Sequence, residues 1–259
     1  MPKTEFVHVV PCLDTRDGRL VKGVHFVNIR ELGDPADAAD AYAAAGADEL
    51  VFLDITATLE GRATFLQAVR RTVRRIADRC PLTVGGGIAS LDDMRRLLDL
   101  GVTRCSVNSA AVRRPELVAE AAGRFGRERV TVAIDTRNSP AVPSGLEVVV
   151  AGGTKPTGRD AVAWARQVDE LGAGAILPTS MDTDGVQTGY DLPMTRAIAD
   201  AVGVPVIASG GAGELDHLSQ AILDGHADAV LVASIAHFGR FTIRQMKEHL
   251  ASKGIPVRM

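Results

Sequence analysis

An apolar run followed by Asp-Thr-Arg occurs twice in the sequence, and each run ends in an aspartate. Asp14 closes the run in CLDTRDGRLVKG, and Asp135 closes the run in AIDTRNSP. A carboxylate at the end of a buried strand is unfavourable unless it is used or paired. Two such carboxylates across one cleft could serve as general acid and general base on opposite faces of a substrate. Each could instead hold its own loop or pair with Lys22 or Arg137, so the residues alone leave both roles open.

Four turns that follow expected strands are rich in glycine or in small polar side chains. The turns VGGGI and ASGGAG supply glycine, while SVNSAA and LVASIA supply side-chain donors. Glycine lets backbone N–H groups approach an anion closely, and the N-terminus of a following helix favours negative charge. Tight turns also need glycine without any ligand. The predicted phosphate contacts are Gly85, Gly86, Gly87, Asn108 and Ser109 in the first half of the chain, and Ser209, Gly210, Gly211, Gly213 and Ser234 in the second.

Other polar side chains near these turns are weaker candidates. Lys22 could clamp a phosphate or lie on the surface, and Asp54 could bind substrate or stabilise the end of its strand. Asp184, in the turn DTDGVQTGYD, could reach the same ligand. The six histidines form no metal-binding pattern, so the sequence predicts no metal and no redox cofactor. His237 is interpreted as a loop-packing residue.

Short β-branched runs alternate with amphipathic segments along the chain, which is typical of parallel βα units. Helical patterns such as DPADAADAYAAAGA and SLDDMRRLLDLGV end near glycine, as many helices do. Eight such units in 259 residues predict an α/β protein with a closed (β/α)8 barrel. An open doubly wound sheet would carry an early G-x-G-x-x-G turn, which LDTRDG does not provide. The expected strands are Phe6–Leu13, Leu50–Ile55, Leu82–Gly85, Arg104–Asn108, Val130–Ile134, Ala175–Thr179, Val206–Ser209 and Ala229–Ser234.

The chain repeats itself over half its length. VGGGIASLDDMRRLLDLG aligns without a gap with ASGGAGELDHLSQAILDG, and GADELVFLDIT aligns with GAGAILPTSMD at nearly the same separation. Repetition at this scale predicts a barrel built from two half-barrels. Positions half a chain apart then face each other, so Asp14 and Asp135 are expected to end opposite strands at one mouth. The two anion sites are expected to be opposed as well, which predicts a long substrate with a phosphate at each end.

No stretch has the composition of a domain linker, so residues 1–259 are expected to form one domain. The segment Arg137–Gly158, rich in Pro, Gly and Ser, is expected to be a long loop over the active face with a small hairpin around Leu146–Val150.

The composition favours a soluble globular protein, with 46% hydrophobic and 24% charged residues and a net charge of −3. It gives no sign of a nucleic-acid-binding surface. Cys12, Cys80 and Cys105 lie far apart, outside any CxxC pair, and are expected to be small buried side chains. No apolar run approaches membrane length and no signal pattern follows Met1, so we expect a cytoplasmic protein without a membrane partner.

Eight motifs in order resemble the cyclase subunit of imidazole glycerol phosphate synthase. They are CLDTRDGRLVKG, DELVFLDIT, TVGGGI, SVNSAAV, VAID, TSMDTDGVQTGYD, VIASGGAG and VLVASIAHF, and the similarity continues to the C-terminal GIPVR. The sister isomerase of the same pathway shares the half-barrel repeat, but its first motif lacks the CLD…GRLVKG form. The resemblance implies a (β/α)8, or TIM, barrel that acts in histidine biosynthesis.

The resemblance also implies a reaction. Ammonia attacks phosphoribulosyl-formimino aminoimidazole carboxamide ribotide, a molecule with two phosphates. Ring closure and cleavage then give imidazole glycerol phosphate and aminoimidazole carboxamide ribotide. Asp14 and Asp135 match the family's acid and base, and Lys22 matches its mobile-loop lysine. Thr179 and Gly185 join the substrate contacts predicted above.

In that family, ammonia arrives through the barrel from a glutaminase bound at the opposite face, past a ring of four charged residues. The matching positions are His8, Glu49, Arg104 and Ala175. His8 stands where the family usually has an arginine, and Ala175 stands where it usually has a glutamate. Three hypotheses follow: a cyclase with a changed gate, a specialised paralogue with another substrate or ammonia source, and a non-catalytic barrel that binds phosphorylated ligands or scaffolds a partner. The paired aspartates argue against the third, because phosphate binding needs no carboxylate.

Overall fold

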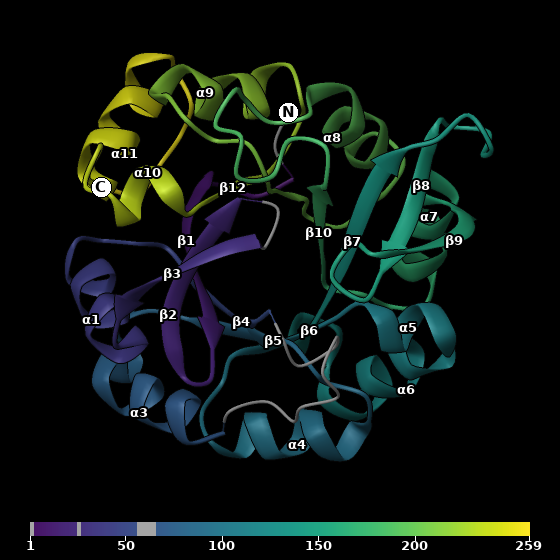
Figure 1. The fold of residues 1–259 in the computed structure, drawn as a ribbon, viewed down its shortest axis with the longest axis horizontal. Coiled ribbons are helices and arrows are strands. Elements are labelled where there is room, and N and C mark those ends of the chain that lie inside the picture. Colours follow the sequence, from purple (N-terminus) through teal and green to yellow (C-terminus); the bar gives the residue numbers. More distant parts are fainter. Residues whose placement is uncertain (1–2, 25–26, 56–65) are drawn as a thin grey trace.

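The chain forms a closed barrel of eight parallel strands surrounded by helices (Figure 1). The computed structural model describes residues 3–24, 27–55 and 66–259, without the side chains of residues 22–24 and 27–30. The predicted (β/α)8 fold is therefore confirmed. The barrel strands are β1 (His8–Arg16), β4 (Leu50–Asp54), β5 (Leu82–Gly85), β6 (Arg104–Val107), β7 (Val130–Asn138), β10 (Ala175–Ser180), β11 (Ile207–Ala208) and β12 (Ala229–Val232).

Helices follow the strands and cover the outside of the barrel. Within the described residues, those of eight or more residues are α1 (Pro35–Ala44), α3 (Leu66–Ile76), α4 (Leu91–Asp99), α6 (Glu116–Phe125), α7 (Ala161–Glu170), α8 (Leu192–Ala199), α9 (Leu215–Leu223) and α11 (Ile243–Ser252). Short helices α5 (Ser109–Arg113) and α10 (Ser234–His237) open directly after β6 and β12, and 3-10 turns lie at Ala77–Arg79 and Arg127–Arg129. Side-chain caps fix several helix starts: Asp34, Ser90 and Asp160 each accept a backbone N–H of the first turn.

Strand pairing closes the sheet. β12 pairs with β1, and the ladder continues through β4, β5, β6 and β7 to β10. The last seam, between β10 and β11, consists of two bridges, Ile176 to Val206 and Thr179 to Ser209. Pro178 lies between these bridges and has no N–H to donate, which accounts for the interrupted ladder and for a seventh strand shorter than expected.

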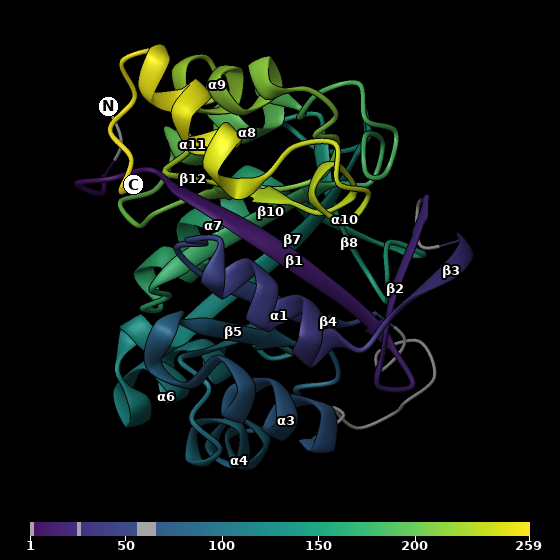
Figure 2. The same cartoon turned by 90° about the vertical axis from the view of Figure 1, so that its left-hand side faces the viewer.

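Each half of the barrel carries a β-hairpin after its first strand. β2 (Arg19–Val24) and β3 (Val27–Gly33) follow β1, while β8 (Leu146–Val150) and β9 (Lys155–Asp160) follow β7. The second hairpin was predicted. The first replaces the polar loop expected around Lys22, since the backbone there pairs in strands. Figure 2 shows both hairpins at the end of the barrel away from the two termini.

The hairpins also correct the predicted strand ends. β1 and β7 run on to Arg16 and Asn138, because their last residues pair with β2 and β8. Asp14 and Asp135 therefore lie within strands instead of ending them. Arg137 forms an ion pair with Glu147 of β8, so it is not the partner of Asp135.

Inward-facing and outward-facing side chains alternate along the strands. Outward residues such as Leu13 and Phe52 join the large apolar layer between strands and helices. A second apolar layer, which includes Val10, Cys12 and Val51, lies among the inward residues. The three cysteines are buried, as predicted. Among the described residues, no helix is long and apolar enough to cross a membrane.

Candidate active site

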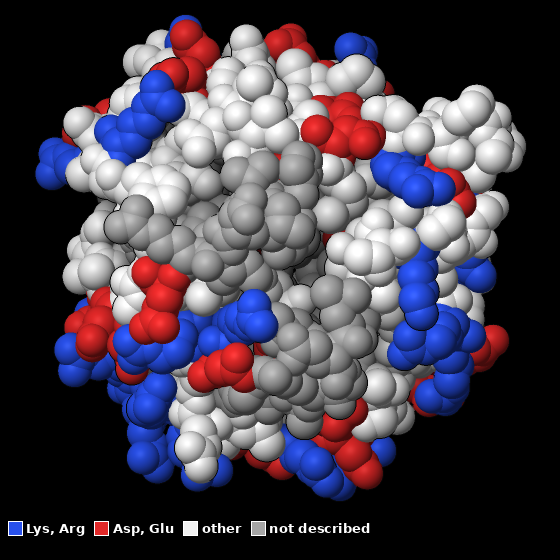
Figure 3. All heavy atoms as spheres, viewed as in Figure 1, with Lys and Arg blue, Asp and Glu red and all other residues white. Residues whose placement is uncertain are grey.

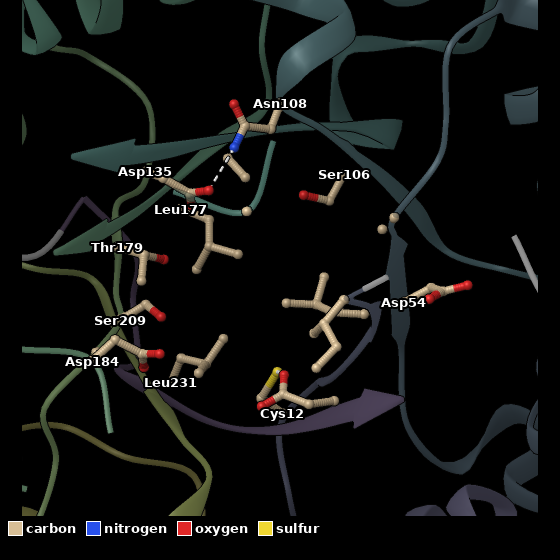
Figure 4. A pocket seen from close by; sticks show the side chains of 18 of the residues that line it. Cys12, Asp54, Ser106, Asn108, Asp135, Leu177, Thr179, Asp184, Ser209 and Leu231 are labelled. Atoms are coloured by element: carbon tan, nitrogen blue, oxygen red, sulfur yellow. Dashed lines mark hydrogen bonds between the residues drawn. The ribbon is translucent and has the colours of Figure 1, made fainter. Parts of the chain in front are cut away.

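A cavity of about 370 Å³ lies at the C-terminal ends of the barrel strands, where barrel enzymes place their active sites. Most of the predicted site residues line it. They are Asp14, Asp54, Gly85, Gly86, Gly87, Asn108, Ser109, Asp135, Thr179, Asp184, Gly185, Ser209, Gly210, Gly211 and Ser234. Figure 4 shows the labelled side chains around this space, with Asp135 and Asn108 on one wall and Cys12 on another.

Strand order sets the two predicted catalytic aspartates on opposite walls. Asp14 belongs to β1 and Asp135 to β7, and three strands separate β1 from β7 in either direction around the barrel. Asp14 is 4% exposed and accepts a hydrogen bond from the Cys12 thiol at 3.1 Å. Asp135 accepts a hydrogen bond from the Asn108 amide at 2.9 Å. A molecule in the cavity can therefore meet a carboxyl group on each side.

The environment of Asp135 raises its pKa to about 7. Burial is the main cause, because it disfavours the charged carboxylate, and the negative charge of Asp184 adds to the rise. The hydrogen bond from Asn108 favours the charged form and opposes both effects. A carboxyl group with a pKa near neutral pH can both donate and accept a proton there.

These opposing causes predict how the pH profile responds to two substitutions. We expect kcat/KM to show an inflection near pH 7 that belongs to Asp135. Asp184→Asn should move this inflection to lower pH, because it removes a negative charge near Asp135. Asn108→Ala should move it to higher pH, because it removes a donor to the carboxylate.

Profiles of the wild type and both variants, recorded with one substrate, test this expectation. The phosphate groups of the ligand titrate alike in all three profiles, so only differences between variants report on Asp135. Shifts of the same sign in the two variants would contradict the assignment.

Two glycine pairs form matching turns at opposite sides of the mouth. Gly86 and Gly87 follow β5 with φ values of 99° and 66°, and Gly210 and Gly211 follow β11 with 86° and 105°. The left-handed conformation is thus shared by residues that the repeat aligns. A Cβ on Gly86 would lie 2.4 Å from the carbonyl oxygen of Asp54, so the turn packs directly on β4.

The short helices α5 and α10 repeat this symmetry. Their N-cap residues have nearly the same backbone angles, φ −129° and ψ −91° at Asn108 and φ −131° and ψ −81° at Ala233. Ser109 and Ser234 then open the two helices at the cavity wall. We call Gly85–Gly87 with Asn108 and Ser109 the first cradle, and Ser209–Gly211 with Ser234 the second cradle. Each combines a glycine turn with a helix start, a combination suited to binding an anion.

Two predicted contacts fall elsewhere. Gly213 does not line the cavity; a Cβ there would lie 2.0 Å from the carbonyl oxygen of Gln187, so glycine is required for packing. The side chain of Lys22 lies outside the described residues, and only its backbone pairing with Arg30 is seen. Among the described residues, no group of His, Cys, Asp or Glu is arranged to hold a metal ion.

Several lining residues were not singled out from the sequence. Cys12 was expected only to fill space, yet its thiol reaches both the cavity and Asp14. Arg113, Ser106, Gly152 and Gln187 also line the cavity. Cys12 lies two residues before Asp14, and residues two apart on a strand face the same side. This spacing could have predicted from the sequence that Cys12 lies beside Asp14.

His237 joins two elements of the site. Its Nε2 lies 2.7 Å from the carbonyl oxygen of Cys12, and its Nδ1 lies 2.8 Å from the Tyr42 hydroxyl. A carbonyl can only accept, so Nε2 carries a proton and donates it to Cys12, while Nδ1 and the Tyr42 hydroxyl form a second hydrogen bond. Burial raises the pKa of Tyr42, which keeps that hydroxyl a donor. His237 thereby fixes α10, which carries Ser234, against the strand that carries Asp14.

Removing the Tyr42 hydroxyl should loosen this connection. We expect Tyr42→Phe to lower the free energy of unfolding by about 1 kcal/mol, because one buried hydrogen bond is lost. Since neither cavity wall is altered directly, kcat should fall by only about 2- to 5-fold, as expected for a small shift in positioning. Urea unfolding and steady-state kinetics measure the two effects. A fall in kcat as large as that of an aspartate variant would contradict this indirect role.

The four predicted gate residues lie at the other end of the barrel. Glu49 is buried, forms an ion pair with Arg104 and accepts a hydrogen bond from Thr83. His8 and Ala175 lie at the starts of β1 and β10. One ion pair of the expected ring is thus present at this end of the barrel.

The fold and the position of the cavity define a (β/α)8 barrel with its candidate site at the C-terminal ends of the strands. A comparison with protein-family models matches residues 8–242 to a family described as histidine biosynthesis protein. The chain therefore belongs to this family of histidine-biosynthesis enzymes, which includes both the isomerase and the cyclase of the pathway.

Proposed function

We propose that the chain is the ammonia-using cyclase of this pathway. In the proposed reaction, ammonia and phosphoribulosyl-formimino aminoimidazole carboxamide ribotide give imidazole glycerol phosphate, aminoimidazole carboxamide ribotide and water. One observation carries the proposal. Asp14 and Asp135 lie on opposite walls of the cavity, and the two cradles lie on opposite sides of the same cavity. A substrate held by a phosphate at each end would lie across the cavity with a carboxyl group on either side.

Proton transfers are the steps that these carboxyl groups would serve. Ammonia must lose protons when it becomes a ring nitrogen, and the departing oxygen and amine must gain them. In the proposal, Asp135 and Asp14 supply and remove these protons from opposite sides of the substrate. The pKa of about 7 suits Asp135 to either direction of transfer at neutral pH.

The barrel interior supports an ammonia supply from the opposite end. Strand register places Thr83, Ser106 and Thr131 on the same inward face as Arg104, on neighbouring strands β5, β6 and β7. Ser106 also lines the cavity. We propose that ammonia follows this polar side of the barrel from a glutaminase that docks at the end carrying Glu49 and Arg104.

Ala175 favours a second candidate, a specialised paralogue that takes ammonia from solution or from another donor. Its methyl group carries no charge at a position where the family has a glutamate, so one of the four expected charges is missing. Such a paralogue would keep the same chemistry at the mouth and differ in its partner or in its substrate.

Turnover by the purified chain alone tests the proposal. The chain is mixed with the bis-phosphorylated ribotide and a high concentration of ammonium salt, without glutaminase, and the products are separated and identified. Formation of both products supports the cyclase. In a separate incubation with the formimino precursor of the ribotide, its rearrangement to the ribulosyl isomer supports the isomerase. A folded chain that binds the ribotide without converting it would favour the third hypothesis, a non-catalytic barrel that binds phosphorylated ligands.

A titration with glutaminase and glutamine then separates the two cyclase candidates. A glutamine-dependent rate that saturates with glutaminase supports the histidine-pathway complex. Activity with ammonium salt alone, unchanged by glutaminase, supports the paralogue. Ala175→Glu provides a matched variant, because it restores the missing charge without touching the mouth.

A further inference from the structure

The cavity is lined by more acidic than basic residues. The acidic residues are Asp14, Asp54, Asp135 and Asp184, of which Asp54 turns its carboxyl group away from the cavity (Figure 4). Among the described residues of the wall, Arg113 is the single cationic side chain. Figure 3 shows charged residues of both signs around the rim of this face. A positive charge on this wall therefore influences where an anionic ligand settles.

Arg113 is placed to act on the first cradle. It ends helix α5, which Ser109 opens, and residues four apart on a helix lie on the same side. Its side chain is exposed and forms no ion pair with any described residue. Arg114, its neighbour, is also exposed, but it pairs with Glu120 and does not line the cavity.

The second cradle has no matching charge. The repeat aligns Ser234 with Ser109, so Phe238 stands where Arg113 stands in the first half. The Phe238 side chain is 56% exposed. The two cradles share their backbone geometry, but only the first has an arginine at the matching position. The two halves of the barrel are therefore alike in fold and different in charge.

We propose that Arg113 is a specificity residue that contacts the phosphate bound in the first cradle and thereby orients a two-phosphate ligand in the cavity. The proposal rests on the proposed function only in taking phosphates as the ligand groups. Arg113 contacts a non-reacting end of the substrate, so it contributes to binding in the ground state and the transition state alike.

The experiment follows phosphate at each cradle separately. Inorganic phosphate is titrated into 15N-labelled protein, and amide shifts of Gly86, Gly87 and Ser109 are compared with those of Gly210, Gly211 and Ser234. Arg113→Ala should weaken phosphate binding at the first cradle about 3- to 10-fold, a moderate effect because the side chain is exposed. Binding at the second cradle should change less than 2-fold. The difference should shrink as ionic strength rises, since salt screens an exposed charge.

Two further variants sharpen the test. Arg114→Ala removes the same charge one residue away and should leave both cradles unchanged. Phe238→Arg places a cation in the matching position and should tighten phosphate at the second cradle by a similar factor. With the full substrate, Arg113→Ala should raise KM and leave kcat nearly unchanged.

The outcomes distinguish this inference from the proposed function. Phosphate that binds the first cradle equally well in Arg113→Ala and wild type overturns the inference, whatever the chain catalyses. Phosphate that does not bind the first cradle of the wild type overturns it as well. A selective loss in Arg113→Ala, combined with no turnover of the ribotide, upholds the inference and counts against the cyclase alone.

Discussion

Asp135→Asn is expected to lower kcat by about 10²–10⁴-fold, the range typical of a lost general acid or base. Asparagine keeps the shape of the side chain and can still accept the hydrogen bond from Asn108, so the cavity should stay intact. Binding of the two-phosphate substrate should survive, because the cradles lie on other turns. Asp14→Asn is expected to have an effect of similar size, since both carboxyl groups would take part in proton transfer.

The same substitution should stabilise the fold at alkaline pH. The folded protein holds the pKa of Asp135 near 7, well above its usual value of 3.8, so the folded state disfavours the charged carboxylate. This unfavourable contribution is absent below about pH 4, grows as pH rises, and is complete above pH 7. We expect the asparagine variant to gain roughly 1–3 kcal/mol over the wild type at pH 8 and much less at pH 5.

Steady-state kinetics and urea unfolding at several pH values measure these effects. Asp182→Asn is the matched control, because Asp182 is an exposed carboxylate near the mouth that bonds to Asn138 and does not line the cavity. It should retain nearly full activity. An Asp135→Asn variant with full activity would remove Asp135 from the proposed mechanism.

The repeat explains why so much of the site was visible in the sequence. Once two half-barrels are aligned, closure of the sheet leaves little freedom, and residues half a chain apart must face each other. On this ground Asp14 was expected opposite Asp135 and one glycine turn opposite the other, as the strand order has them, although the two aspartates lie within their strands and do not end them. The glycine turns were also recognisable because few other residues adopt their positive φ angles.

What the sequence did not reveal depends on contacts between distant segments. The extension of β1 beyond Leu13 depends on pairing with β4 and, at Thr15 and Arg16, with β2, whose residues carry no simple alternation. The raised pKa of Asp135 depends first on burial by the assembled barrel and then on the charge of Asp184 from another loop. Arg113 resembles any surface arginine until α5 is seen to begin at the cavity wall. Gly213 looked like part of the anion turn because its neighbours are, although its real constraint is the carbonyl group of Gln187.

Gly86→Ala is expected to damage both stability and the first cradle. The new Cβ would lie 2.4 Å from the carbonyl oxygen and 2.8 Å from the amide nitrogen of Asp54, and backbone atoms of a central strand cannot move aside easily. The φ angle of 99° adds strain of its own. Together these effects should lower the free energy of unfolding by about 3–5 kcal/mol.

Gly46→Ala separates the two causes. Gly46 also has a positive φ, 85°, but nothing lies within 4 Å of its added Cβ. It should therefore lose only about 1–2 kcal/mol, from backbone strain. Urea unfolding of both variants gives the difference that belongs to the contact with Asp54.

Phosphate titration completes the comparison. Because Asp54 lines the cavity, a shift of the turn should also weaken phosphate binding at the first cradle, whereas Gly46→Ala should bind phosphate like the wild type. Equal stability losses in the two variants would mean that β4 yields to the new methyl group. The close packing of the Gly86 turn on Asp54 would then not be what fixes the first cradle in place.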